Sequence, residues 1–138
     1  MKQLGLFIVF LSALIIVSCD KDEDEVSARF DMLTTPVWVS DSLLVNGSDA
    51  SGSGELLGDF NGDVKFNADG TGYFGDYTGT WRFEKEETEL VIITDALDFP
   101  LTTKIAELTS SSLKITTDFP NPLNPEEEFN IRMTFKAK

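Results

Sequence analysis

The stretch Glu128 to Lys138 reads EFNIRMTFKAK, and apolar and polar residues alternate along most of it. Phe129, Ile131, Met133 and Phe135 occupy every second position, so they share one face of an extended chain, and the polar residues between them share the other. A period of two is typical of a β-strand with one buried face. We therefore predict a half-buried strand here.

Seven further segments upstream show strand signals, with β-branched and aromatic residues bounded by turn-forming residues. They are residues 37–45, 63–67, 72–77, 79–84, 89–94, 102–108 and 112–117. Most connections are short, and no segment of helical period is long enough for the crossover helix of a parallel sheet. The sequence therefore predicts an all-β fold, an antiparallel up-and-down barrel of eight strands, whose closure leaves no exposed sheet edge.

Two longer loops interrupt this rhythm. Residues 46–60 are rich in Gly, Ser and Asp, and residues 117–127 contain three prolines, which lack the amide donor that a central strand requires. We expect both loops at the mouths of the barrel. Residues 28–33 are expected to form a helical turn that plugs one barrel end.

The N-terminal region predicts export. Met1-Lys2 precedes an apolar stretch from Leu4 to Val17, which is the plan of a secretory signal peptide and falls short of the roughly 20 apolar residues of a membrane-spanning helix. Five of the six residues after Cys19 are acidic, and such a dense charge favours a disordered segment. The sequence thus predicts a signal peptide over residues 1–18, an acidic flexible tether over 19–32 and a barrel domain over 33–138.

Ile16-Val17-Ser18-Cys19 resembles the lipobox of bacterial lipoproteins. The resemblance implies cleavage before Cys19 and acyl chains on that residue, which would attach the protein to the membrane. The alternative is an ordinary secretory signal with an incidental cysteine. Lys21, Asp22 and Glu23 resemble the surface-export signal of lipoproteins in one phylum of Gram-negative bacteria. That resemblance implies a lipid-anchored outer-membrane protein on the cell surface, with the inner face of the outer membrane as the alternative.

Several short motifs resemble the small lipocalin-like domains of bacterial lipoproteins. They are Asp69-Gly70-Thr71-Gly72, Gly79-Thr80-Trp81, Leu90-Val91-Ile92, residues 105–109 and Leu113-Lys114-Ile115. The resemblance covers residues 33 to 135 and implies a lipocalin-like eight-stranded barrel. Pro36-Val37-Trp38 departs from the Gly-x-Trp that often opens the first strand in that family, although Trp38 can still close the barrel bottom.

The composition excludes several functional classes. The chain has 24 acidic residues, 11 basic residues and no histidine, for a net charge of -13. Such a charge repels polynucleotides, so we expect no nucleic-acid partner. Without histidine and with a single cysteine, the chain lacks the groups for His-based triads, thiolate catalysis and Cys/His zinc sites. We expect no enzyme activity and no cofactor.

Two groups of residues with side-chain oxygens do not match the pattern of a calcium site or of a glycosidase. Asp59, Asn61 and Asp63 alternate as calcium ligands do, but the glycine and glutamate of an EF-hand are missing from their positions. Turn formation is the simpler explanation, with an irregular calcium site as the alternative, so we expect no metal. The glutamates within residues 84–89 are expected at a solvated hairpin tip, because glycosidase chemistry needs two carboxyl groups facing each other across a cleft.

Aromatic residues on the predicted strands are the best lead to a function. An eight-stranded barrel either fills its interior with such side chains or holds one small ligand. In a hollow barrel the expected pocket residues are Trp81, Phe83, Phe129, Ile131 and Met133. The sequence thus predicts a lipid-anchored cell-envelope protein whose barrel binds a small apolar ligand or a glycan. The alternative is a filled barrel whose mouth loops contact an envelope protein.

Overall fold

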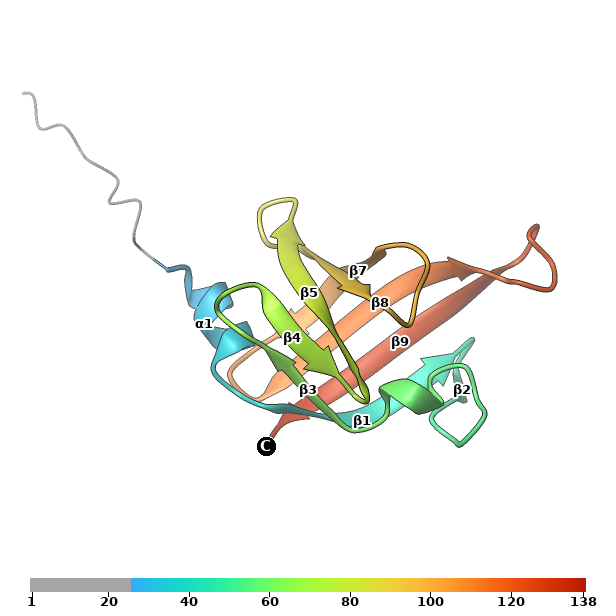
Figure 1. Ribbon diagram of the computed structural model, residues 1–138, viewed down its shortest axis with the longest axis horizontal. Helices are drawn as coiled ribbons and strands as arrows, with labels where there is room; N and C mark the ends of the chain where they lie inside the picture. The colour runs from blue at the N-terminus through green and yellow to red at the C-terminus, as the bar shows by residue number, and fades with distance from the viewer. Residues whose placement is uncertain (1–25) are drawn as a thin grey trace, which may run out of the picture.

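The computed structural model describes residues 26–138, which form a closed antiparallel β-barrel (Figure 1). The predicted signal peptide, Cys19 and the export motif Lys21, Asp22 and Glu23 lie outside the described residues. Within residues 26–138, no helix has both the length and the hydropathy of a membrane span.

Eight strands make the barrel wall. They are β1 (Trp38–Val45), β3 (Asp63–Phe66), β4 (Thr71–Phe74), β5 (Tyr77–Glu84), β6 (Glu89–Thr94), β7 (Leu101–Leu108), β8 (Ser112–Pro120) and β9 (Glu128–Ala137). The helix α1 (Ala28–Thr34), the short strand β2 (Ser48–Asp49) and the 3-10 turn η1 (Gly58–Phe60) complete the chain. Each wall strand pairs antiparallel with the next, and β1 pairs with β9. The predicted eight-stranded up-and-down barrel is therefore confirmed.

The alternating stretch at the C-terminus forms β9, which closes the barrel. Ile131, Met133 and Phe135 are buried, whereas Arg132 and Lys136 are exposed. The strand pairs with β1 on one side and with β8 on the other. Its apolar residues therefore face the barrel interior along two seams, which explains why the alternation is so regular.

The segment 72–77, expected as one strand, is divided by a turn. β4 ends at Phe74 and β5 begins at Tyr77, and these two residues pair across the turn. Gly75 has a φ of 60°, a conformation that glycine adopts without the steric cost of a side chain. The Gly75-Asp76 pair is a local turn signal that indicates this division, although the predicted strand runs across it.

β8 is longer than predicted. It continues to Pro120, so only residues 121–127 form the loop that we expected over 117–127. Beyond Thr116 the strand pairs with β9 alone. The N–H of Asn121 bonds the Glu127 carbonyl oxygen at 2.9 Å, so the nitrogen of Pro120, one residue earlier, faces away from β9. Because no strand pairs on that side, the missing donor breaks no hydrogen bond.

α1 closes one end of the barrel, as predicted for residues 28–33 (Figure 1). The Ser27 hydroxyl oxygen accepts the N–H of Phe30 at 3.0 Å and caps the helix. Leu33 is fully buried, and the ring centroid of Phe30 lies 5.6 Å from that of Trp81. The helix thus runs across residue 33, where the sequence placed the boundary between tether and barrel.

Aromatic side chains fill the barrel beside α1. The ring of Phe66 lies 5.4 Å from Phe74 and 5.7 Å from Trp81, and Trp81 lies 5.5 Å from Phe83. All three pairs meet edge to face, which aromatic quadrupoles favour. The indole N–H of Trp81 donates to the Asn67 carbonyl oxygen at 2.9 Å. This end of the barrel is therefore a packed core.

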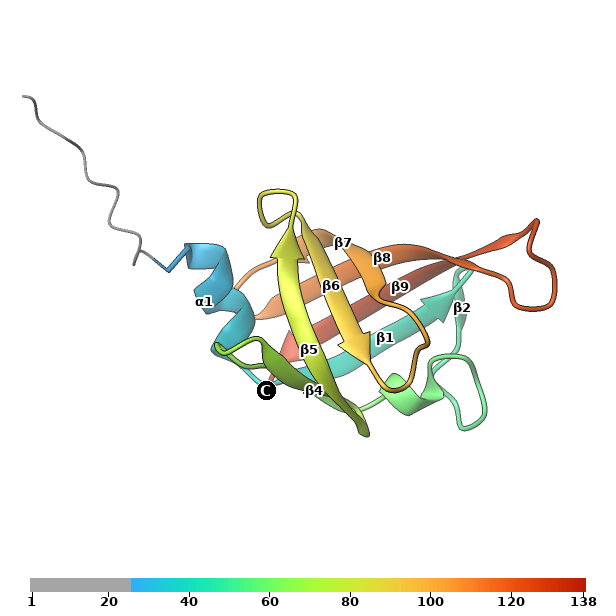
Figure 2. The same cartoon turned by 45° about the horizontal axis from the view of Figure 1, so that its top comes forward.

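Two facing glycines allow the wall to curve sharply. Gly72 and Gly79 pair across β4 and β5. A Cβ on Gly72 would collide with the carbonyl oxygen of Lys65, and one on Gly79 with the carbonyl oxygen of Ile93. β5 and β6 cross β1, β8 and β9 at a steep angle (Figure 2). Glycine is required here because neighbouring backbone occupies the space of a side chain.

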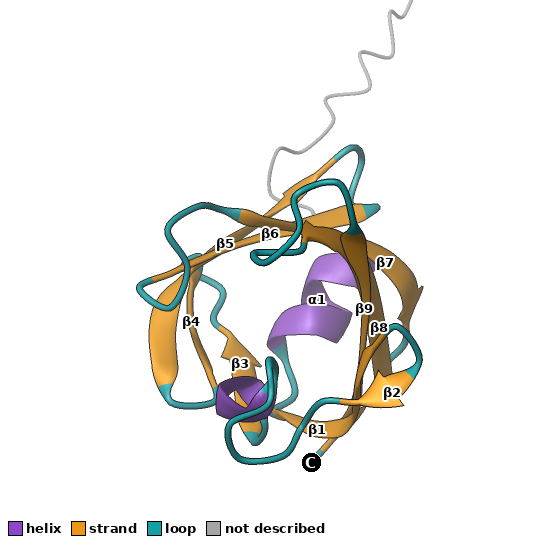
Figure 3. Cartoon of the chain, turned by 90° about the vertical axis from the view of Figure 1, so that its right-hand side faces the viewer, coloured by secondary structure: helices purple, strands orange, loops and turns teal. Residues whose placement is uncertain are grey.

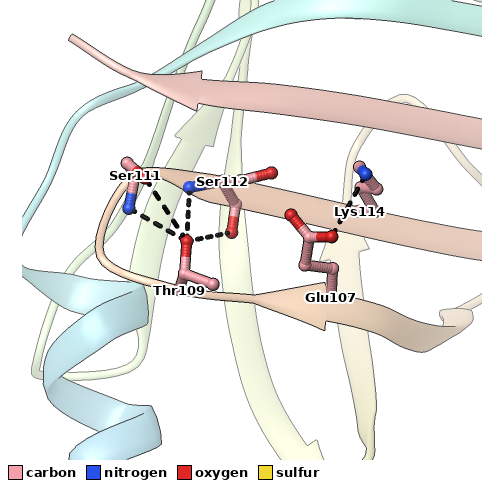
Figure 4. A network of polar contacts seen from close by, with 5 residues as sticks. All are labelled: Glu107, Thr109, Ser111, Ser112 and Lys114. Carbon is pink, nitrogen blue, oxygen red and sulfur yellow. Dashed lines mark hydrogen bonds and ion pairs between the residues drawn. The ribbon is translucent and has the colours of Figure 1, made fainter.

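Side-chain hydrogen bonds hold the turn between β7 and β8 (Figure 4). The Thr109 hydroxyl oxygen accepts the N–H groups of Ser111 and Ser112 at 3.2 and 2.9 Å. Glu107 and Lys114 form an ion pair of 3.1 Å across the same hairpin. The short link predicted over residues 109–111 is confirmed, and its chemistry is that of a hydroxyl-stabilised turn.

Candidate functional site

The barrel mouth lies at the end opposite α1, which is seen at the far end of the barrel in Figure 3. Four connections surround it: residues 46–62, 75–76, 95–100 and 121–127. The two long loops that the sequence placed at barrel mouths are therefore both at this one mouth. Loops at the open end of a rigid barrel are a common position for binding residues.

An apolar cavity of about 50 Å³ lies just inside the mouth. It is lined by Leu56, Leu57, Phe60, Leu97, Leu101, Thr117, Phe119, Ile131 and Met133. A second pocket of about 20 Å³ lies deeper and shares four of these residues. Thr117 is the one polar residue in the lining of the first cavity, and its hydroxyl donates to the Thr102 carbonyl oxygen at 2.8 Å. The cavity therefore offers apolar contact almost exclusively.

Aromatic rings pack the barrel beside α1, and small apolar cavities remain between this core and the mouth. Pockets for drug-sized ligands measure about 300–1,000 Å³, far more than the 50 Å³ and 20 Å³ of the two cavities. One water-sized group needs about 10–15 Å³ of such space. The cavity therefore has room for a few methylene-sized groups, which suits the end of a slender chain better than a large ring system.

The structure separates the five residues that the sequence placed in one pocket. Ile131 and Met133 line the cavity, and Phe129 lies further towards the mouth on the same face of β9. Trp81 and Phe83 pack together at the α1 end and do not line it. All five positions face inward, but alternation does not report the height of a residue along the barrel axis.

Sequence reasoning missed the loop residues that cover the cavity. Leu56 and Leu57 lie in the Gly/Ser/Asp-rich loop, Phe60 ends η1, and Leu97 belongs to the connection between β6 and β7. The N–H of Leu57 donates to the Ala50 carbonyl oxygen at 3.0 Å, which folds the loop back on itself. An apolar pair inside an otherwise polar loop is the signal that could have identified this cover.

The segments that surround the mouth carry many acidic residues and no basic residue. Residues 46–62, 75–77, 94–101 and 117–130 contain no lysine or arginine. They contain ten exposed acidic residues: Asp49, Glu55, Asp59, Asp76, Asp95, Asp98, Asp118, Glu126, Glu127 and Glu128. Among the described residues there are five ion pairs, and none includes a member of this set. We call these ten residues the acidic rim.

Neighbouring polar groups hold two members of the acidic rim. Asp49 accepts the hydroxyl of Ser51 at 2.6 Å and its N–H at 2.9 Å, and these hydrogen bonds lower the pKa of Asp49. Asp59 accepts the hydroxyl of Tyr77 at 3.0 Å, and this bond raises the pKa of Tyr77 because it favours the protonated phenol. Asp49 is therefore ionised at neutral pH, and the Asp59 contact ties η1 to β5.

The three residues weighed as calcium ligands do not converge. Asp59 contacts Tyr77, Asn61 accepts the Ser40 hydroxyl at 2.6 Å, and Asp63 pairs with Lys138 at 2.7 Å. Within residues 26–138, no three His, Cys, Asp or Glu residues lie close enough together to hold a metal ion. Each of the three side chains has a separate local contact.

The glutamate-rich hairpin tip is tied to α1. Residues 85–88 form the turn between β5 and β6. The Ser27 hydroxyl donates to a Glu87 carboxylate oxygen at 2.5 Å, and Arg29 donates to the Glu87 carbonyl oxygen at 3.0 Å. Glu89, expected to be solvated, is buried and pairs with Lys85 at 2.7 Å. This ion pair joins the turn to β6, a contact that strand alternation does not predict.

A polar groove on the outer face of the barrel offers different chemistry. It measures about 130 Å³ and is lined by Glu89, Thr102, Lys104, Thr116, Thr117, Asp118 and Asn130. Its hydroxyl, amide and charged groups suit a polar ligand such as a glycan. The mouth cavity and this outer groove are therefore surfaces of opposite polarity.

No protein-family model matches this chain, and no curated protein sequence matches it at a significant level.

Proposed function

We propose that this chain is a non-enzymatic, lipid-anchored protein of the cell envelope whose barrel mouth binds the apolar part of a small ligand. The observation that carries the proposal is the apolar cavity below the mouth, with Leu57, Phe60, Phe119 and Met133 in its walls. Burial of apolar surface there is favourable by about 25 cal/mol per Å². A barrel mouth is also a common place for small-ligand sites.

The cavity lining supports an apolar ligand better than a glycan. A buried hydroxyl without a hydrogen-bond partner costs about 1–3 kcal/mol in proteins, and the one hydroxyl in the lining, on Thr117, already donates to Thr102. The Thr117 oxygen can still accept a hydrogen bond, but one acceptor cannot satisfy the several hydroxyl groups of a sugar. A glycan would fit the outer groove of β6 to β9 instead.

Movement of two loops would admit such a ligand. Within the cover, the Leu57 N–H bonds the Ala50 carbonyl oxygen at 3.0 Å, and the Leu97 N–H bonds the Thr94 carbonyl oxygen at 3.3 Å. Neither contact belongs to the strand ladder that closes the barrel. Loop segments outside the strand ladder open at lower free energy than the barrel wall. Ligand entry therefore requires no separation of strands.

Native mass spectrometry tests ligand binding directly. Protein purified from its natural membrane is measured under native and denaturing conditions, and we expect a bound mass that is lost on denaturation. The Met133→Phe variant places a larger ring in the cavity wall and should lack that mass. Thr134→Val, on the opposite face of the same strand, is the matched control and should keep it. A bare wild-type mass, with no uptake of added alkyl chains, contradicts the proposal.

Anchoring through Cys19 and display on the cell surface are part of the same proposal. The lipobox-like segment supports acylation, and Lys21, Asp22 and Glu23 support export. Cys19→Ser should release the protein from the membrane fraction, with Ser18→Ala as the control that stays bound. Protease added to intact cells should remove the barrel. Retention of Cys19→Ser in the membrane, or full protection from protease, would overturn the respective claim.

A second candidate is contact with an envelope protein through the mouth loops. Leu123 is 94% exposed in the loop between β8 and β9, which extends beyond the barrel wall (Figure 1). A partner that covers this loop would bury the Leu123 side chain, and complete burial of a leucine is favourable by about 1.5–3 kcal/mol. Leu123→Ser should weaken a partner contact and leave uptake of alkyl chains unchanged. Equal loss of both would argue against a separate protein contact.

A further inference from the structure

The acidic rim surrounds an apolar cavity, and this combination points to the charge of the ligand. Glu55 immediately precedes Leu56, Asp98 immediately follows Leu97, and both leucines line the cavity. Neither carboxylate belongs to any ion pair among the described residues. A chain that enters between these two loops would place its head group beside these carboxylates. A head group of positive charge is the complementary one.

The rest of the domain has a different charge distribution. Arg29 lies in α1 and donates to the adjacent hairpin. Lys65 donates to a carbonyl oxygen at the C-terminal end of α1, and Lys85 pairs with Glu89 within the hairpin. Lys136 and Lys138 lie at the end of β9, on the α1 side of the barrel. All nine basic residues of the described chain lie outside the mouth segments, and Lys104, which lines the outer groove with Asp118, shares a pocket with a member of the acidic rim. The mouth segments therefore carry ten carboxylates and no basic residue, and low-dielectric walls of a cleft focus such a field.

We propose that the ligand is an amphiphile with a cationic head group, whose apolar chain occupies the cavity and whose cation lies among the carboxylates of the acidic rim. This inference rests on the proposed function of the mouth. It excludes fatty acids and other anionic chains as the favoured ligands, because the rim repels their head groups. It also disfavours insertion of the mouth into an anionic membrane surface, despite the exposed Phe99 and Leu123.

Three eight-carbon probes with different head groups separate chain binding from charge recognition. Octyltrimethylammonium, octanol and octanoate are titrated into the purified protein by calorimetry at low and high salt. We expect the cation to bind at least ten-fold more tightly than the anion at low salt, with octanol between them. We expect high salt to reduce this ratio, because rim charges are exposed and screened.

Charge variants locate the preference. Glu55→Gln with Asp98→Asn should reduce the cation-to-octanol affinity ratio at least three-fold and leave octanol binding unchanged. The matched double variant Asp31→Asn with Glu86→Gln removes two exposed carboxylates at the α1 end and should leave the ratio unchanged. If both double variants lower the ratio equally, net charge rather than the rim explains it, and the assignment of the cation site is wrong.

The outcomes distinguish this inference from the proposed function. Equal binding of all three probes, or tighter binding of octanoate, overturns the cationic ligand and keeps the apolar site. Binding of none overturns both. Met133→Phe should abolish binding of every probe, and Thr117→Leu serves the same purpose if Met133→Phe fails to fold. If a cavity-filling variant folds and still binds the cation as tightly as the wild type, the acidic rim binds cations without the cavity. That result also overturns the proposal.

Discussion

The indole N–H of Trp38 donates to the carbonyl oxygen of Leu33 at 3.0 Å, and both residues are completely buried. The bond joins the last turn of α1 to the first residue of β1. It satisfies a helix carbonyl that has no partner within the helix and fixes the helix against the barrel floor. This contact therefore couples α1, which closes the barrel end, to the wall strand β1.

Trp38→Phe should lower the free energy of unfolding by about 2–4 kcal/mol. The substitution leaves the buried Leu33 carbonyl without its donor, which costs about 1–3 kcal/mol, and also removes ring volume from the core. Chemical denaturation followed by far-UV circular dichroism measures the change. Tyr73→Phe, which removes a hydroxyl that makes no hydrogen bond within residues 26–138, is the control and should stay within about 0.5 kcal/mol. Equal changes in the free energy of unfolding for both variants would show that the hydrogen bond from Trp38 to Leu33 does not stabilise the fold.

Lys65 should stabilise the C-terminal end of α1. Its ammonium group donates to the carbonyl oxygens of Thr34, Thr35 and Pro36, at 2.5, 3.0 and 3.1 Å. A cation at a helix C-terminus contributes about 0.3–1 kcal/mol, and up to about 2 kcal/mol where it is partly buried. We expect Lys65→Met to cost about 1–2 kcal/mol in thermal unfolding experiments.

The control for Lys65 is Lys104→Met, on an exposed position of β7. It removes the same charge from an acidic protein, so the two variants share any change in long-range repulsion. Hydrogen exchange should also show faster exchange in α1 for Lys65→Met alone. Unchanged α1 protection would show that the three carbonyl contacts do not hold the helix.

Gly79→Ala should destabilise the barrel more than Gly47→Ala. A methyl group on Gly79 meets the Ile93 carbonyl oxygen on the neighbouring strand, whereas one on Gly47 meets nothing within 4 Å. Gly47 has a φ of 81°, so its replacement costs only the local strain of about 1 kcal/mol. Gly79→Ala should cost about 2–3 kcal/mol by overpacking. Equal midpoints of urea unfolding for the two variants would show that β5 and β6 accommodate the added methyl group without an extra loss of stability.

Two aspartates in similar turns should make stability depend on acid pH. Asp69 accepts the hydroxyl and the N–H of Thr71 at 2.6 and 2.9 Å, as Asp49 does with Ser51, and these bonds lower the pKa of Asp69. A lowered pKa in the folded state stabilises the fold above the unfolded value of about 3.9. This contribution disappears as the pH falls through the folded pKa.

Asp69→Asn should therefore be less stable than the wild type at pH 6, and the difference should shrink below about pH 4. Unfolding by urea at pH 6, 4 and 3 measures this convergence. Asp98→Asn is the control, because the Asp98 carboxylate accepts no hydrogen bond from the part of the chain that the structure describes. A stability difference for Asp69→Asn that is constant across this range would show that the Thr71 contacts do not favour the ionised carboxylate.

Strand positions were predictable because alternation is a local property. Each of Phe129, Ile131, Met133 and Phe135 could be assigned to one face from its neighbours alone, and the structure places all four on the inner face of β9. The boundary errors have local causes. Gly75, with its positive φ, divides one predicted strand into β4 and β5. β8 continues through Pro120, because the nitrogen of Pro120 faces no paired strand.

The composition of the cavity depended on contacts between distant segments. Met133 and Trp81 have the same inward orientation, but only Met133 lines the cavity, because the stagger of paired strands sets the height of each residue in the barrel. Leu57 reaches the same cavity from a loop that local patterns describe only as polar. Sequence reasoning could therefore name inward residues but not the group that meets at the mouth.

The sequence by itself determined the strand faces, the number of strands and the excess of acidic residues, since each follows from composition or from a repeat of two residues. Only the tertiary structure decided that the interior is filled beside α1, that a small apolar cavity remains at the mouth, and that the acidic rim encircles it. The physical reason is barrel closure. Pairing of β1 with β9 brings loops from distant parts of the chain to one end, and no local pattern records which ones meet.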